Sequence, residues 1–198
     1  MTILLRLVRN YRIACILIAP LKNALSLALA ITCALFSLAH SDTLETGMEY
    51  KLKAAFVYNF LQFVEFDRKP DTEFGDTLRV CVVSNNDFPE GFDELSSKQV
   101  LGKRIEIVRL TSRQEFNQCS VLFYVAPVEP DISKSLDKAA RSGILTVGES
   151  DSFVGSGGMI HFLIKANKLR FRVDLAKVRE ARITISSRIL KLAEEILQ

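Results

Sequence analysis

The chain has 198 residues, with 26 basic and 23 acidic side chains. Four of the basic residues and none of the acidic ones precede Asp42, so the remainder carries 22 basic against 23 acidic side chains, a net charge near −1. Nucleic-acid-binding domains usually carry an excess of basic residues, which this part of the chain lacks. With no tandem repeat, low-complexity tract or Pro/Ser-rich linker, the remainder is expected to form one domain.

The N-terminal segment has the layout of a secretory signal peptide. A basic stretch that ends at Lys22 precedes an apolar run over 24–39, which finishes in the small-x-small pattern Ser37-Leu38-Ala39. We expect cleavage near Ala39, which gives a signal peptide over 1–39 and a single α/β domain over 40–198. An uncleaved membrane anchor is the alternative, and both readings place the domain outside the cytoplasm.

The cysteines agree with export. Two of the four, Cys15 and Cys33, lie in the leader, which leaves Cys81 and Cys119. In an oxidising compartment such a pair predicts one disulfide, with two buried free thiols as the alternative. The spacing and the lack of further ligands argue against a CxxC redox centre or a zinc site.

The first element after the leader is a helix over 48–66 that is apolar on two opposite faces. One face carries Met48, Leu52, Phe56, Phe60 and Phe63, and the other carries Val57, Tyr58, Leu61 and Val64. The pattern fits a central core helix. It also fits a helix that meets a second subunit or a partner through Tyr58 and Leu61.

The middle of the chain alternates short apolar runs with turn residues, which predicts strands and a βαβ unit with parallel pairing. The expected strands cover 78–83, 105–110, 121–126 and 144–147. A short helix is expected around 93–100. A longer helix begins at Pro130-Asp131 and ends at Gly143.

A glycine-rich loop over 148–158 follows the last of these strands. Ligand sites in open α/β sheets favour such strand ends, but this loop lacks the Gly-Lys-Ser/Thr of a phosphate-binding loop and leads into a strand. Its glycines therefore favour a tight turn and a bulge. Candidate ligand or partner contacts in and after the loop are Glu149, Phe153, Met159 and His161.

The chain then turns back as a hairpin and ends in a helix. Strands over 159–164 and 169–173 flank Ala166-Asn167, which places Arg170 and Arg172 on one face. This face could meet an acidic partner surface or could simply be solvated. The final helix is expected to carry a stripe of Ile185, Ile189, Leu192, Ala193 and Ile196, with Ser186 or Ser187 as its cap. The predicted fold is α/β, a small three-layer mixed, partly parallel sheet flanked by helices, ending in a β-hairpin and a C-terminal helix.

No group of residues assembles a reaction. His161 stands alone in a strand, no Gly-x-Ser-x-Gly elbow occurs, and no cluster has metal-ligand spacing. The acidic residues from Asp87 to Glu94 are more simply a solvated turn and helix start. We therefore predict a non-enzymatic protein with no cofactor and no metal.

Seven segments, taken in order, resemble the YfiR family of exported regulators. They are 53–60 (KAAFVYNF), 79–83, 119–123, 144–150 with Phe153, 157–160, 169–171 and 185–193. The resemblance implies a small periplasmic α/β domain, often dimeric, that binds the periplasmic sensor part of an inner-membrane diguanylate cyclase. Such a protein represses the enzyme, which lowers cyclic-di-GMP and biofilm formation, until redox stress or an outer-membrane lipoprotein partner removes it.

The sequence departs from the family pattern at two places. The second cysteine pair of the best-known members is missing from 152–160, although Cys81 and Cys119 match the structural pair. Arg172 and Asp174 replace an acidic residue and an asparagine that many relatives carry. The main hypothesis is a repressor that binds a membrane enzyme. The alternative is a periplasmic small-ligand sensor that reports to a histidine kinase or another membrane partner.

Overall fold

The computed structural model describes residues 41–67, 76–85, 88–111, 114–125 and 132–198. The expected signal peptide over 1–39 lies outside the described residues, as do Asp87 and the helix start at Pro130-Asp131. No helix in the described ranges is long and apolar enough to cross a membrane.

The first described element is helix α3, Ser41–Leu61. Residues Ala54, Val57, Phe60 and Leu61 of this helix are buried. The helix ends earlier than the predicted 48–66, because its last expected turn is a separate strand, β1, Val64–Phe66. This strand pairs antiparallel with β9, Ile183–Ile185, so a long-range partner overrides the helical spacing of 63–66.

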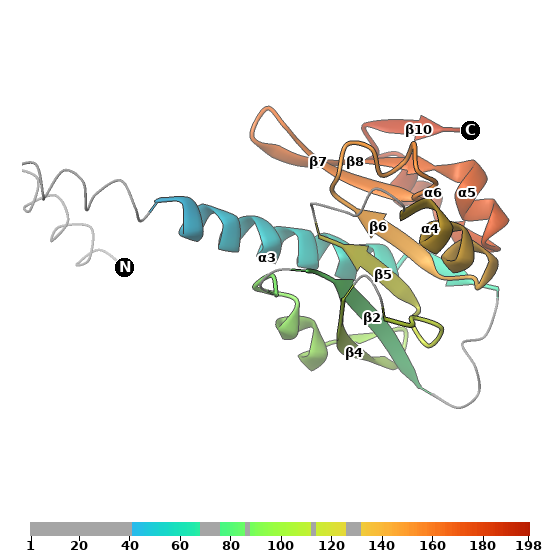
Figure 1. Cartoon of the computed structure of the whole chain (residues 1–198), viewed down its shortest axis with the longest axis horizontal. Helices are drawn as coiled ribbons and strands as arrows, with labels where there is room; N and C mark the ends of the chain where they lie inside the picture. Colours follow the sequence, from blue (N-terminus) through green and yellow to red (C-terminus); the bar gives the residue numbers. More distant parts are fainter. Residues whose placement is uncertain (1–40, 68–75, 86–87, 112–113, 126–131) are drawn as a thin grey trace, which may run out of the picture. The chain divides into compact units, whose positions relative to one another are not determined.

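Eight strands form the main sheet in the order β10-β8-β7-β6-β5-β2-β4-β3 (Figure 1). Their bounds are β2 Thr77–Val83, β3 Gln99–Val100, β4 Lys103–Leu110, β5 Val121–Tyr124, β6 Leu145–Gly148, β7 Ile160–Lys165, β8 Lys168–Asp174 and β10 Glu195–Leu197. The neighbours from β4 through β7 pair in parallel, and so do β8 and β10. The pairs β3–β4 and β7–β8 are antiparallel, which confirms a mixed, partly parallel sheet.

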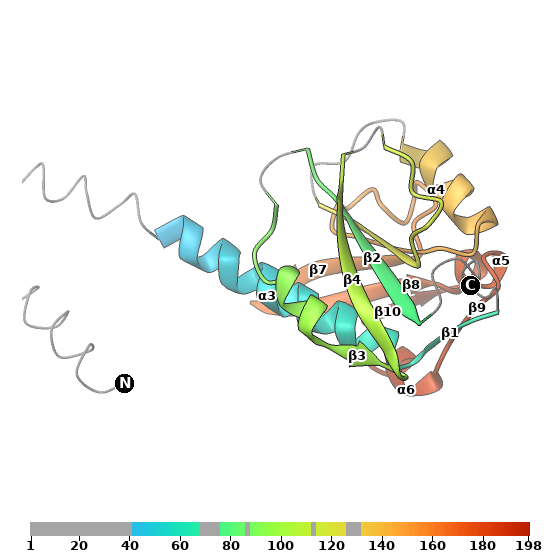
Figure 2. The same ribbon diagram turned by 90° about the horizontal axis from the view of Figure 1, so that it is seen from below.

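Alternate residues of the central strands enter two different cores. Val80 and Phe123 pack with α3, whereas Cys81 and Leu122 pack with helix α4, Ile132–Arg141. This period of two is the expected pattern for strands covered on both faces. Figure 2 shows α3 and α4 on opposite sides of the central strands, which gives the predicted three layers.

The hairpin and the disulfide are confirmed. Ala166 and Asn167 both have positive φ, 49° and 57°, in the two-residue turn between β7 and β8, as a type I′ hairpin requires. Cys81 of β2 is bonded to Cys119, just before β5, with a Cα–Cα distance of 5.9 Å. The bridge therefore ties two neighbouring parallel strands on the α4 side of the sheet.

Two predicted helices are shorter than expected, and one helix was not predicted. The helix around 93–100 is a 3-10 helix, η2, Asp93–Ser97, followed by β3. The final helix is limited to α6, Ser187–Leu190, with the Ser186 hydroxyl accepting from the Arg188 amide as its cap. The unexpected helix is α5, Leu175–Glu180, which Asp174 caps through the Lys177 amide.

The apolar stripe expected on the final helix is distributed over three elements. Ile185 is buried in β9, Ile189 is buried in α6, and Ile196 lies in β10. Leu192 is 64% exposed. Residues 183–185 pair with β1 and residues 195–197 pair with β8, so only 187–190 remain helical. Strand pairing therefore overrides the helical spacing of the apolar residues.

Candidate functional site

A cluster of charged side chains joins α3 to the carboxyl end of β6. Lys53 Nζ donates a hydrogen bond to Glu149 and lies 2.5 Å from Glu49 Oε1. The Tyr50 hydroxyl donates to the other Glu149 carboxylate oxygen at 2.7 Å. The side chains of Lys53 and Glu149 are each only 6% exposed. Separating the two side chains would leave an unpaired buried charge, which is energetically costly. The pair therefore favours the observed position of α3 against the end of β6.

The surroundings of Tyr50 keep its hydroxyl protonated. Burial raises the pKa of this phenol above its ordinary value, and the hydrogen bond to Glu149 and the charges of Glu149 and Glu49 raise it further. Lys53 Nζ also lies 4.5 Å from the centre of the Tyr50 ring, within range of a cation–π interaction. Tyr50 therefore remains a hydrogen-bond donor to Glu149 over the physiological pH range.

A pocket of about 420 Å³ lies beside this cluster. Its lining residues are Glu49, Tyr50, Lys53, Glu149, Asp151, Phe162, Leu163 and Ile164. Glu149 was a candidate from the sequence, but Lys53 and Tyr50 were not. The only signal in the sequence was a lysine at the start of the apolar run 53–61, and nothing in the spacing indicated its contact with Glu149.

The glycine-rich loop over 148–158 holds an aromatic ring. Phe153 is fully buried, and a Cβ added at Gly148 or Gly158 would lie 2.4 Å or 2.2 Å from its ring atoms. The glycines at these two positions are therefore needed for the close approach of the backbone to the ring. The ring also packs on Tyr124, with centroids 5.8 Å apart. The Phe153 side chain therefore fills the space between these two glycines and leaves no room for a ligand there.

The burial of two further candidates corrects their proposed role. Met159 is fully buried and Leu61 is 1% exposed, so neither side chain is accessible to a partner or a ligand in this chain. The same applies to Phe153. These residues serve the cores that support the site, because the apolar side chains around them leave no open surface.

His161 is also buried, with 1% of its surface exposed. Its Nε2 lies 3.9 Å from the Asp151 carboxylate, and across the hairpin it pairs in register with Arg172. Burial lowers the pKa of this imidazole, and the positive charge of Arg172 lowers it further. His161 is therefore a neutral packed residue, not an accessible contact.

Arg170 and Arg172 lie on the same face of β8, as predicted, with side chains 44% and 41% exposed. The C-terminal segment supplies acidic neighbours to both. Arg172 Nε lies 3.0 Å from Glu195 Oε2, and Arg170 Nε lies 4.0 Å from Glu194 Oε2. The hydrogen bond from Lys165 lowers the pKa of Glu194, with further contributions from the arginines. Nothing in the sequence pattern predicted that Glu194 and Glu195 would face these arginines.

Tyr58 remains partly accessible on α3. Its hydroxyl donates to the Gln99 carbonyl at 3.3 Å, and Lys98 Nζ lies 5.7 Å from its ring centre. The helix also exposes Met48 and Leu52, by 71% and 44%. The accessible apolar surface of α3 therefore includes Met48, Leu52 and part of Tyr58, but not Leu61.

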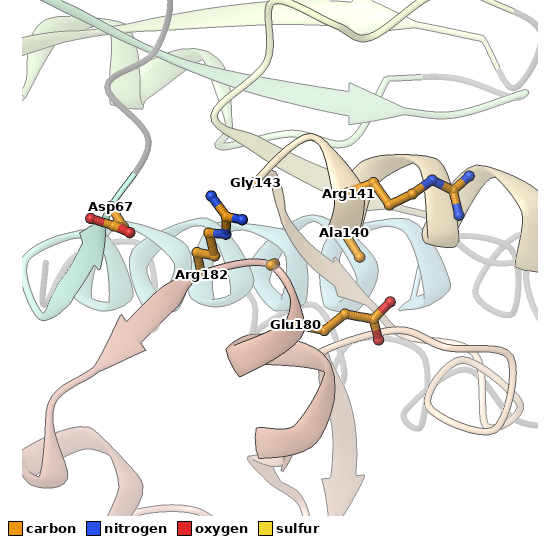
Figure 3. Close-up of a pocket in the computed structure, with 7 residues that line it drawn as sticks. Asp67, Ala140, Arg141, Gly143, Glu180 and Arg182 are labelled. Atoms are coloured by element: carbon orange, nitrogen blue, oxygen red, sulfur yellow. The ribbon is translucent and has the colours of Figure 1, made fainter.

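A second pocket, of about 600 Å³, lies where α4 and α5 end. Asp67, Arg141, Glu180 and Arg182 surround it, and the Arg182 carbonyl accepts from the Asp67 amide at 3.2 Å. Figure 3 shows the Arg141 guanidinium pointing away from Arg182. With two side chains of each sign, this pocket has no strong preference for one charge.

The fold and these sites define a small disulfide-linked α/β domain with a buried ion pair and a charged hairpin. No group of three or more histidine, cysteine or acidic side chains in the described ranges could hold a metal ion. The chain belongs to the YfiR/HmsC-like family, whose profile matches residues 50–194. This match confirms the resemblance stated from the sequence segments.

Two solved structures share weaker similarity with the chain. A conserved domain protein from Vibrio cholerae O1 biovar eltor has 12% identity and a TM-score of 0.49, with 74% of this chain and 60% of that chain covered. The ABC domain of a Streptococcus pneumonia protein, crystallised in complex with L-Trp, has 12% identity and a TM-score of 0.39, with coverages of 61% and 55%. The chain thus spans less than two thirds of either protein. No curated protein matches it.

Proposed function

We propose that this protein is an exported, non-enzymatic regulator that binds the periplasmic part of an inner-membrane diguanylate cyclase and represses it. The observation that carries the proposal is membership of the YfiR/HmsC-like family over residues 50–194. Repression would lower cyclic-di-GMP and biofilm formation. A homodimer and an outer-membrane lipoprotein that relieves repression are further partners in this proposal.

Export requires that the N-terminal segment act as a signal peptide, with the domain over 40–198 released into the periplasm. The acid-free leader motivates this part of the proposal. Mass spectrometry of the periplasmic fraction should show a chain shortened by the leader. An intact N-terminus in the membrane fraction would instead identify an anchor.

We propose the β8 face with Arg170 and Arg172 as the docking surface for the membrane partner. Both arginine side chains are partly exposed, and the carboxylates of Glu194 and Glu195 already lie beside their Nε atoms. An acidic partner surface would form the same charge-assisted pairs. Residues 152–160 contain no cysteine. The proposal therefore does not include redox control through a second cysteine pair.

Capture from detergent-solubilised membranes tests the docking surface. The tagged protein should retain a diguanylate cyclase, and Arg170→Glu with Arg172→Glu should release it while the domain stays folded, because rim charges govern association. Arg104→Glu with Arg179→Glu is the matched control, since it changes the net charge equally at exposed positions outside the hairpin. Equal capture by both variants would exclude the hairpin face.

The pocket beside Glu149 favours a second candidate function. Its volume of about 420 Å³ lies within the usual range of small-molecule sites, roughly 300–1,000 Å³. In this case the protein would be a periplasmic sensor that binds a small ligand and reports it to a histidine kinase or another membrane partner. A saturable increase in thermal stability with a metabolite library tests this function.

A further inference from the structure

We propose that the pocket beside Glu149 binds a small organic amine, namely a primary ammonium group carried on an apolar, aromatic body. This inference rests on the ligand-sensing function proposed above and names its ligand class. Three properties of the pocket carry it: its excess of carboxylates, its apolar wall, and the engagement of its single lysine.

The charges of the pocket select a cation. Glu49, Glu149 and Asp151 line it, and Lys53 is the one basic side chain among the lining residues. Lys53 is already paired with Glu49 and Glu149, whereas the Asp151 side chain is fully exposed. An entering ammonium group would meet the uncompensated negative charge, and a carboxylate would be repelled. The same argument disfavours an amino acid relative to the amine that its decarboxylation yields.

An organic cation fits the pocket better than a metal ion. The acidic side chains around the pocket do not form a group that could hold a metal ion, within the ranges that the structure describes. An ammonium group instead needs separate acceptors that surround its three N–H donors. Carboxylate oxygens of Glu49 and Asp151 and the hydroxyl oxygen of Tyr50, whose proton points to Glu149, are suited to this role.

The opposite wall of the pocket is apolar. It is formed by Phe162, Leu163 and Ile164 at the end of β7. Ile164 is 50% exposed, so an apolar ligand body that covers it would remove part of its surface from water. A ligand with an ammonium end and an apolar ring can contact both the carboxylates and the apolar wall, whereas a fully polar cation can contact only the carboxylates favourably.

Three probes with the same phenylethyl body test the inference on the protein purified from the periplasm after expression of the full chain. Phenethylamine, 2-phenylethanol and 3-phenylpropionate carry the same ring with a cationic, neutral or anionic end. By calorimetry we expect saturable binding of phenethylamine, at least about threefold weaker binding of the alcohol, and the weakest binding for the carboxylate. Putrescine, a cation without an apolar ring, should bind more weakly than phenethylamine.

A charge reversal at the rim completes the test. Asp151→Lys should weaken phenethylamine binding by about tenfold or more, because it removes an attractive charge and adds a repulsive one. Asp93→Lys is the matched control, since Asp93 is an exposed carboxylate that does not line the pocket. Circular dichroism of both variants checks that they are folded.

The outcomes separate this inference from the function on which it rests. Stronger binding of the alcohol or the carboxylate, or unchanged phenethylamine affinity in the Asp151→Lys variant, would overturn the amine class. Saturable binding of another compound in this pocket would then leave the sensing function standing. If no probe and no library compound binds, the sensing function and the amine inference fail together.

Discussion

Lys53 and Glu149 form a buried ion pair although 96 residues separate them in the chain. Lys53 lies on α3, which covers one face of the sheet, and Glu149 follows directly after β6. Tyr50 donates a further hydrogen bond to Glu149, and Glu49 forms a second ion pair with Lys53. The pair therefore connects the helix that exposes Met48 and Leu52 with the strand end at which the pocket lies.

The energetic importance of this pair is the first prediction. Lys53→Met should lower the free energy of unfolding by about 3–5 kcal/mol, because it leaves the Glu149 carboxylate buried without its cation. Adding Glu149→Gln should restore part of the loss, since the amide carries no charge and still accepts from Tyr50. Urea denaturation of the two single variants and the double variant measures the coupling.

A neighbouring lysine provides the control for this experiment. Lys51→Met, at an exposed position of the same helix, should change stability by no more than about 0.5 kcal/mol. Strictly additive effects of Lys53→Met and Glu149→Gln would show that the two charges do not stabilise each other.

The second prediction concerns the close packing of the Phe153 ring against Gly158. Gly158→Ala places a methyl group against the buried ring and should destabilise the protein by about 3 kcal/mol, near the upper end of overpacking effects. Gly155→Ala serves as the control, because its added Cβ would meet only the Ser152 carbonyl at an ordinary 3.6 Å. Thermal or urea unfolding compares the two. Equal stabilities would mean that the ring can move aside, so that the loop is more open than described.

The third prediction concerns the disulfide between Cys81 and Cys119, which closes a sequence separation of 38 residues. Replacing both cysteines with alanine should cost about 4 kcal/mol of unfolding free energy, chiefly through the entropy of the unfolded chain. Thiol labelling of the unreduced, denatured, leader-free protein should find no reactive thiol. Two reactive thiols would show that the bond is absent in the cell.

The fourth prediction is a dependence of stability on pH that arises from His161. Burial and Arg172 lower its pKa in the folded protein, with Asp151 and Glu149 opposing them, relative to an ordinary value of 6.5. Above pH 6.5 the imidazole is neutral in both states, so its contribution to stability is complete. As the pH falls below this value, the unfolded chain binds a proton that the folded chain does not, and stability decreases.

The measurement is the difference in unfolding free energy between the wild type and His161→Gln, followed from pH 7.5 to pH 5. We expect the wild type to lose stability faster as the pH falls, by at most about 1.4 kcal/mol per pH unit for one proton. A difference that does not change over this range, or one that changes in the opposite direction, would show that His161 does not titrate as its burial requires.

Most strands could be predicted because their sequence signals are local. Val121–Tyr124 is an unbroken apolar run and is buried on both faces, and β2 alternates between two cores as its composition suggests. The hairpin turn at Ala166-Asn167 follows from the asparagine, which tolerates positive φ, between two runs of alternating residues. In these elements the local sequence is sufficient to predict the secondary structure.

Elements that depend on distant partners could not be predicted in this way. Val64–Phe66 continues the helical spacing of α3 but pairs with Ile183–Ile185, which also removes the start of the expected C-terminal helix. Glu195–Leu197 pairs with β8 in parallel. Both segments are short and apolar, so periodicity alone cannot separate strand from helix.

The candidate site was predicted only in part for a similar reason. Glu149 follows a buried strand, which marks it as a ligand-side residue, but its partner Lys53 lies on an element that sequence spacing does not place beside it. The glycines of 148–158 predicted a tight turn and a bulge, and the buried Phe153 ring adds the reason why Gly148 and Gly158 carry no side chain. Phe153 and Met159, which were candidate contacts from the sequence, are instead core residues that support the site.

Repression of a membrane diguanylate cyclase by this protein is tested most directly by an enzyme assay. Membranes that contain the captured cyclase are mixed with increasing amounts of the purified protein, and cyclic-di-GMP synthesis from GTP is followed. We expect saturable inhibition that the Arg170→Glu, Arg172→Glu variant loses and the Arg104→Glu, Arg179→Glu control retains. Cyclic-di-GMP synthesis that stays constant at saturating protein, or that rises, would contradict it.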